Sequence, residues 1–112
     1  RAQGLSGASK TSAVVIGRAQ VNFAGFTAVV DGKNQPLTHK ECALLKLLHD
    51  RRGEVVSRDE ILDQIWSPDE FPTTRTVDNF ILRLRKLVES DPAQPTVIRS
   101  VRGIGYQLTE SP

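Results

Sequence analysis

The hydrophobic positions between Arg75 and Glu89 recur at helical spacing. They fall at i, i+3, i+4, i+7, i+10 and i+11, and they are Val77, Phe80, Ile81, Leu84, Leu87 and Val88. Side chains at these intervals share one side of a helix. The pattern therefore predicts a helix over residues 75–89 whose apolar stripe packs on a core.

Two further helices are predicted upstream, and each opens with a capping box, in which an N-cap hydroxyl and a carboxylate three residues later bond each other's backbone N–H. Thr38 and Glu41 form the first box, and Ser57 and Glu60 form the second. The apolar positions that follow them are Cys42, Leu44, Leu45, Leu47 and Leu48 in one helix and Ile61, Leu62, Ile65 and Trp66 in the other. Both helices are expected to pack on the same core.

Short strand-like runs precede and follow these helices. Four lie between residues 14 and 37, separated by glycine-containing turns, and they predict a small antiparallel sheet. Residues 54–56 have room for one short strand. After Pro92 and Pro95 end the long helix, residues 96–101 and 106–109 predict a β-hairpin with Arg102 at its tip.

The order of elements predicts an α+β fold, a winged helix-turn-helix. It has an N-terminal four-stranded antiparallel sheet, three helices and a C-terminal β-hairpin wing. Residues 14–110 make up this domain. Residues 1–13 are rich in Gly, Ser and Ala, and they are expected to form a flexible linker or a tag remnant.

The length of the chain, 112 residues, and its composition allow one ordinary globular domain, and the net charge of the chain is only +2. The charge is unevenly distributed. Between residues 74 and 106, six cations stand against three carboxylates, whereas between residues 57 and 73 one cation stands against five carboxylates. Adjoining segments of opposite sign suggest two different partners or two different functions.

Cys42 is the only cysteine, so the chain has neither an internal disulfide nor a cysteine-built metal site. A single thiol fits a reducing compartment, and we expect a cytoplasmic location. His39 and His49 lack a second ligand at metal spacing, and the sequence implies no metal and no cofactor. It shows no signal peptide and no apolar run of membrane-spanning length. Because it contains no methionine, we expect a fragment of a longer protein.

The polar side of the 75–89 helix carries the candidate chemistry. At helical rotation it gathers Arg75, Asn79, Leu82, Arg83 and Lys86. Arginine pairs with guanine edges and phosphates, asparagine with adenine, and an apolar side chain suits a thymine methyl. A solvated basic face is the alternative, but a second basic feature at the hairpin tip favours DNA binding.

Several motifs, in this order and spacing, resemble the OmpR/PhoB type of bacterial two-component response-regulator effector domain. They are Leu37-Thr38…Glu41…Leu44-Leu45, Gly53…Val56-Ser57-Arg58…Leu62…Trp66, Arg75-Thr76-Val77-Asp78, Leu84-Arg85-Lys86 and Val101-Arg102-Gly103-Ile104-Gly105-Tyr106. The resemblance covers roughly residues 14–109. It implies sequence-specific binding to promoter DNA, transcription regulation, and an N-terminal receiver domain phosphorylated on an aspartate.

The resemblance also implies roles for individual residues. It places base contacts at Asp78, Asn79 and Arg83, DNA backbone contacts at Arg75, Thr76 and Arg85, and Arg102 in the minor groove. Lys86 is expected to contact phosphate, and Leu82 either a thymine methyl or a neighbouring protomer. Phe80 departs from the family, where this position is often polar, and it is expected in the core.

The acidic segment 67–74 corresponds in the family to a loop that touches RNA polymerase, which points to Asp69, Glu70 and Phe71. The family pattern also suggests two copies on a direct repeat, with phosphorylation of the receiver promoting a homodimer.

Other function classes are disfavoured by the sequence. An enzyme would need a nucleophile–base pair or a histidine metal pattern, and the carboxylates Asp59, Glu60 and Asp63 have neither. A winged helix that binds protein would fit a neutral or acidic third helix. A DNA-binding domain joined to a sensor other than a receiver stays open.

Overall fold

A computed structural model describes residues 13–109 of the chain. The first four strands form an antiparallel meander in sequence order: β1 (Ala13–Ile16), β2 (Ala19–Asn22), β3 (Thr27–Val30) and β4 (Lys33–Pro36). Short turns set the register, which pairs Ala19 with Val30 across β2 and β3. The predicted four-stranded sheet is therefore confirmed. Of the predicted linker, only Ala13 lies within the described residues, and it begins β1.

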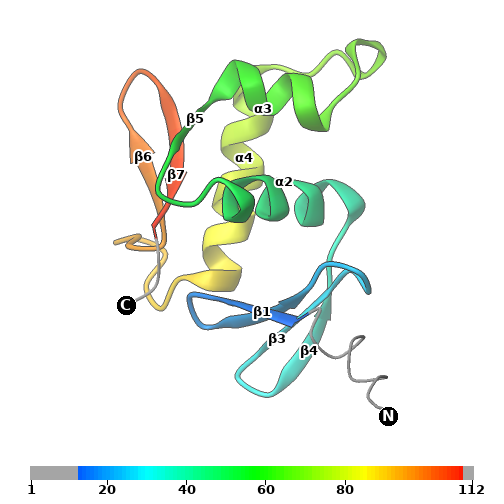
Figure 1. Ribbon diagram of the computed structural model, residues 1–112, viewed down its shortest axis with the longest axis vertical. Coiled ribbons are helices and arrows are strands. Elements are labelled where there is room, and N and C mark those ends of the chain that lie inside the picture. The colour runs from blue at the N-terminus through cyan, green and yellow to red at the C-terminus, as the bar shows by residue number, and fades with distance from the viewer. Residues whose placement is uncertain (1–12, 110–112) are drawn as a thin grey trace.

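Three helices follow the sheet: α2 (His39–Asp50), α3 (Arg58–Ile65) and α4 (Thr74–Val88), with a single 3₁₀ turn, η1 (Pro68–Glu70), between the last two. In Figure 1, α2 crosses α4, and α3 lies near the N-terminal half of α4. The long helix begins and ends one residue earlier than the predicted 75–89.

The C-terminal hairpin belongs to a second, three-stranded sheet. Its strands are β5 (Val55–Ser57), β6 (Ile98–Val101) and β7 (Gly105–Leu108), and β7 lies between the other two. Val56 pairs with Tyr106, so the short strand before α3 fastens the hairpin to the helices. The hairpin was predicted, but its pairing with β5 was not.

The two capping boxes differ. In the first, Glu41 N donates to Thr38 Oγ1 at 3.1 Å and Thr38 N donates to Glu41 Oε1 at 2.9 Å, as predicted. In the second, Glu60 N donates to Ser57 Oγ, but the Glu60 carboxylate pairs with Arg51 instead of returning to the cap. The prediction of a full second box is wrong, because a cation from the end of α2 competes for that carboxylate.

One hydrophobic cluster joins both sheets and all three helices. The α4 stripe is buried as predicted, with Phe80 half-buried against the cluster. Cys42 is 3% exposed, which confirms that it packs as a small hydrophobe. None of the helices within residues 13–109 is long and apolar enough to cross a membrane.

Candidate nucleic-acid interface

The side of α4 that faces away from the core is basic and exposed. Five residues on this side are solvent-exposed: Arg75, Asn79, Leu82, Arg83 and Lys86. Leu82 leaves 54% of its surface open even though it is apolar. The structure therefore brings together all the residues that helical spacing alone had gathered, and we call these five the reading face.

Asp78 lies beside the reading face but is already held by two neighbours. Arg58 Nε donates to Asp78 Oδ1 at 3.0 Å, and the Tyr106 hydroxyl donates to the same oxygen at 2.5 Å. Arg58 begins α3 and Tyr106 lies in β7. One carboxylate oxygen thus ties α4 to the helix before it and to the wing.

Arg85 makes a second link between α4 and the wing. Its Nε donates to the carbonyl oxygen of Ile98 at 3.1 Å, and its Nη2 donates to Ser100 Oγ at 2.9 Å. The guanidinium carbons of Arg58 and Arg85 lie 5.8 and 5.7 Å from the centre of the Tyr106 ring. These cation–π contacts add to the hydrogen bonds that fix the hairpin against the helix.

Tyr106 stays a hydrogen-bond donor in this network. Burial raises the pKa of its hydroxyl, the bond to Asp78 raises it further, and Arg58 opposes both. The phenol therefore remains protonated well above neutral pH. The sequence placed Tyr106 in a strand and Arg58 in a helix start, but it gave no signal that either would reach Asp78.

Both ends of α4 are fixed. At its start, Thr76 N donates to the Thr73 hydroxyl and Thr73 N donates to the Thr76 hydroxyl. At its end, Arg18, in the turn between β1 and β2, donates through Nη2 to the carbonyl of Lys86 at 2.9 Å and through Nε to that of Leu87 at 3.3 Å. A cation at a helix C-terminus also complements the helix dipole. The N-terminal sheet therefore caps the helix that carries the reading face.

Gly17 makes this capping turn possible, and Gly17→Ala should destabilise the domain. Its φ is +59°, and an added Cβ would lie 2.2 Å from the carbonyl oxygen of Val88. Strain and clash together should cost roughly 2 kcal/mol or more. Gly32 is the matched control, because its φ is +77° but a Cβ there meets nothing within 4 Å. Thermal melts check this expectation, and equal losses in the two variants would contradict it.

The wing presents Arg102 and Ile104 to solvent. Both lie in the turn between β6 and β7, where Gly103 takes a φ of +76°. Ile104 is 54% exposed. Its carbonyl oxygen accepts a hydrogen bond from Arg58 N at 3.3 Å, which links the wing turn to the start of α3. The predicted basic hairpin tip is thus accessible and anchored.

The segment between α3 and α4 is acidic and aromatic, as the sequence indicated. Its side chains differ in whether they are held by contacts or displayed to solvent. Glu70 pairs with Lys40 at 2.8 Å and bonds the backbone of Ser67, and the contact with Lys40 holds the pKa of Glu70 below its usual range. Phe71 has a left-handed backbone and is 86% exposed. Asp69 is also exposed. Glu70 therefore shapes the loop that displays its two neighbours.

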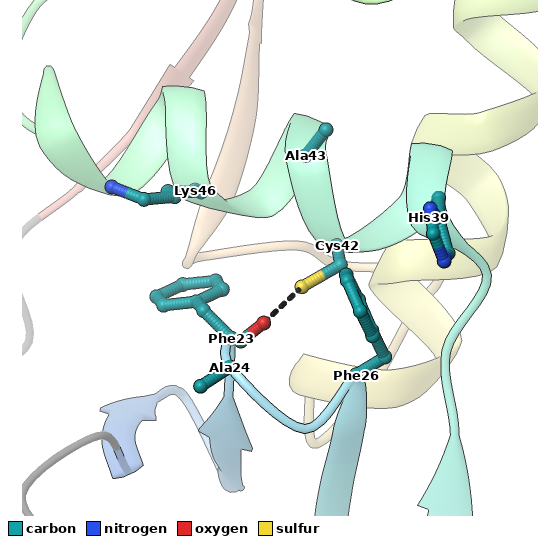
Figure 2. Close-up of a pocket in the computed structure, with 7 residues that line it drawn as sticks. All are labelled: Phe23, Ala24, Phe26, His39, Cys42, Ala43 and Lys46. Atoms are coloured by element: carbon teal, nitrogen blue, oxygen red, sulfur yellow. Dashed lines mark hydrogen bonds between the residues drawn. The ribbon is translucent and has the colours of Figure 1, made fainter. Parts of the chain in front are cut away.

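Figure 2 shows an apolar hollow of about 610 Å³ between α2 and the turn that joins β2 to β3. The Phe26 ring stacks on His39 at 4.3 Å, and Cys42 Sγ points to the carbonyl oxygen of Phe23 at 3.5 Å. Burial raises the pKa of the Cys42 thiol, so it is a poor nucleophile. Within residues 13–109, no three His, Cys, Asp or Glu side chains gather as metal ligands would.

Comparison with known proteins decides between the function classes. Residues 32–108 match the family described as transcriptional regulatory protein, C terminal. The chain belongs to this family. AfsQ1, a transcriptional regulatory protein of Streptomyces coelicolor, is 37% identical over 98 residues, which cover 88% of this chain and 44% of AfsQ1.

Solved structures agree with this assignment. DrrB, a Thermotoga maritima response regulator described as an OmpR/PhoB homologue, superposes with a TM-score of 0.75 at 34% identity, over 88% of this chain and 45% of DrrB. The DNA-binding domain of E. coli CadC superposes with a TM-score of 0.74 at 30% identity, over 88% of this chain and 92% of that domain. The OmpR/PhoB-type winged helix is thus confirmed. This domain spans less than half the length of AfsQ1 and DrrB, and the family is one of transcription regulators rather than enzymes.

Proposed function

We propose that this OmpR/PhoB-type domain binds promoter DNA sequence-specifically and regulates transcription as the C-terminal effector of a phosphorylation-controlled response regulator. The observation that carries the proposal is the exposed reading face, a basic helix surface that also offers an amide and an apolar side chain. Hydrogen bonds from Tyr106 to Asp78 and from Arg85 to β6 hold this helix against a wing that has its own exposed arginine. A helix with this surface fits the major groove while the wing reaches an adjoining groove.

Within this proposal, Asn79, Leu82 and Arg83 contact base edges. Asp78 joins them through Oδ2, because the bonds from Arg58 and Tyr106 both end on Oδ1. Backbone contacts come from Arg75, Thr76, Arg85 and Lys86. Arg85 has Nη1 left for a phosphate, since its Nε and Nη2 bond strand β6. Phosphate contacts supply affinity and base contacts supply sequence preference.

The proposal extends to partners outside the described residues. One domain covers a short half-site, so two copies bind a direct repeat as a homodimer in the cytoplasm. An N-terminal receiver domain controls that pairing, and the loop 67–74 touches RNA polymerase. The likeness to DrrB, a response regulator of about twice this length, supports the receiver.

An NMR titration tests which surface meets DNA. With a mixed-sequence duplex at low salt, backbone amide signals of α4 and of the Arg102 turn should shift, because these are the basic exposed elements. Signals of Ala43 and Lys46, on the outer side of α2, should stay in place. Shifts concentrated on α2 or on the four-stranded sheet would contradict the assigned interface.

Arg102→Ala should weaken binding about equally on all sequences and flatten its dependence on salt. Loss of one phosphate or groove contact lowers the slope of log K against log salt by about 0.9. Arg52→Ala is the matched control, because Arg52 is an exposed cation just after α2. Fluorescence anisotropy at four salt concentrations gives both slopes. A slope for Arg102→Ala equal to that of the parent would remove the wing from the interface.

Asp69→Asn combined with Phe71→Ala should reduce activated transcription while leaving DNA affinity unchanged. Both side chains are exposed, whereas Glu70 holds the loop to Lys40 and is left in place. Reporter transcription in vitro and DNA affinity are measured on the same preparations. Asp59→Asn, on the exposed surface of α3, serves as the control. A loss of DNA affinity in the loop variant would assign the loop a role in the fold instead.

A further inference from the structure

Arg83 differs from the other cations of the reading face because two groups restrain it, Phe80 one turn earlier on α4 and Glu41 on α2. Its guanidinium carbon lies 4.7 Å from the centre of the Phe80 ring, and its Nη1 lies 3.9 Å from Glu41 Oε2. Phe80 is itself held edge-on against Trp66, with ring centres 5.1 Å apart. The guanidinium therefore rests on a fixed aromatic surface with a carboxylate at its edge.

Glu41 is suited to this contact because its position is set by the capping box of α2. Its Oε1 accepts from Thr38 N at 2.9 Å, which leaves Oε2 directed at Arg83. Only 17% of the Glu41 side chain is exposed, against 58% of the Arg83 side chain. A carboxylate that is mostly shielded from water acts more strongly on a nearby charge than an exposed one does.

We propose that Glu41 and Phe80 are specificity-determining residues that position Arg83 and limit its attraction to phosphate. This inference rests on the proposed function. A free arginine beside DNA pairs with phosphates on any sequence, and such contacts carry no sequence information. Held by Glu41, Arg83 gains less from a phosphate, but a guanine edge aligned with the guanidinium still offers it two hydrogen bonds. Weakening the wrong contacts in this way raises discrimination.

Glu41→Gln isolates the effect of the charge. The amide oxygen of glutamine can replace the carboxylate oxygen that completes the capping box, so α2 should start as before. With the carboxylate gone, Arg83 should neutralise one more phosphate on non-specific duplex, which steepens the slope of log K against log salt by about 0.9. Between 200 and 50 mM salt, the non-specific affinity of Glu41→Gln should therefore rise roughly threefold more than that of the parent, and the ratio of specific to non-specific affinity should fall accordingly.

Asp50→Asn is the matched control, because it removes one negative charge from the other end of α2, where Asp50 pairs with Lys46. It should leave both the slope and the ratio near their parental values. Equal effects of Asp50→Asn and Glu41→Gln would show that only the net charge of the protein matters, and this would overturn the inference.

Combination with Arg83→Ala shows whether Glu41 acts through Arg83. The steeper slope caused by Glu41→Gln should vanish when Arg83 is alanine. If it persists, Glu41 repels DNA directly and the positioning role is overturned. If Arg83→Ala changes binding to neither the specific nor the non-specific duplex, the proposed base contact of Arg83 is wrong. This outcome is distinct from failure of the positioning role of Glu41.

NMR relaxation tests the restraint directly, first in the unmodified protein and then in one variant. NMR relaxation of the arginine Nε–H groups should show a higher order parameter for Arg83 than for Arg75, which is exposed on the first turn of α4. Phe80→Leu should lower the Arg83 value by removing the ring. Equal order in Arg83 and Arg75 of the parent would overturn the inference.

Discussion

Replacing Arg83 by alanine should lower affinity for the selected DNA site by about 5- to 150-fold, equivalent to roughly 1–3 kcal/mol. The reason is that its guanidinium is the one group of the reading face that is both exposed and held in a defined position, over Phe80 and beside Glu41. A bidentate contact to guanine loses both hydrogen bonds when the side chain is cut back. Preference at one base position should relax as well.

Competition binding with duplexes that differ at single positions measures this effect. Lys46→Ala is the matched control, since it removes an equal charge from an exposed site on α2. A variant Arg83→Ala that binds its site as tightly as the parent, with the same preference at every position, would show that Arg83 reads no base.

Glu89→Ala should cost at least about 3 kcal/mol of the free energy of unfolding. Glu89 is 1% exposed, and its carboxylate accepts hydrogen bonds from the backbone N–H groups of Thr96, Val97 and Ile98 at 2.8–3.1 Å. It folds the connector after α4 back to begin strand β6. Without it, three N–H donors lose a charged acceptor; each such hydrogen bond contributes roughly 1.5–3 kcal/mol, and less where water can replace the acceptor, as at the exposed Thr96.

A loss of 3 kcal/mol should lower the melting temperature by roughly 12–24 °C in a domain of this size. Glu89→Gln should lie between the parent and Glu89→Ala, because one oxygen remains to accept. Asp91→Ala is the control: it removes an exposed carboxylate that bonds only Ala93 N within the described residues, and it should shift the melt by a few degrees at most. Melting of Glu89→Ala within a few degrees of the parent would rule out this role for the carboxylate.

Patterns in the sequence predicted the helices and caps that depend on interactions between residues close together in the chain. The α4 stripe follows from a 3.6-residue period, and the start of α2 follows from Thr38 and Glu41, whose bonds span three residues. The reading face follows from the same period. These predictions hold because each depends on residues within one or two turns of one another.

Contacts between distant segments were not predictable from spacing. Asp78 meets Tyr106 from 28 positions away, and Arg18 reaches the end of α4 from 68 positions away. Glu60 was expected to complete a capping box, but Arg51 draws its carboxylate away. In each case several polar partners would satisfy the side chain equally well, and the packing of the helices and sheets selects one.

The residues of the reading face could therefore be predicted from the sequence, whereas the residues that position α4 and its side chains could not. Arg58, Tyr106 and Glu41 look like an ordinary helix start, a strand residue and a cap. Their second roles arise only because α2, α3 and the wing all meet α4 (Figure 1).

Selection from a random duplex library, performed with this domain at two salt concentrations, tests sequence-specific DNA binding most directly. Base contacts lose less affinity with added salt than phosphate contacts do. We therefore expect one enriched direct repeat that persists at the higher salt. Binding that is uniform across sequences and disappears at the higher salt would contradict the account, because the basic face of α4 would then attract DNA without reading it.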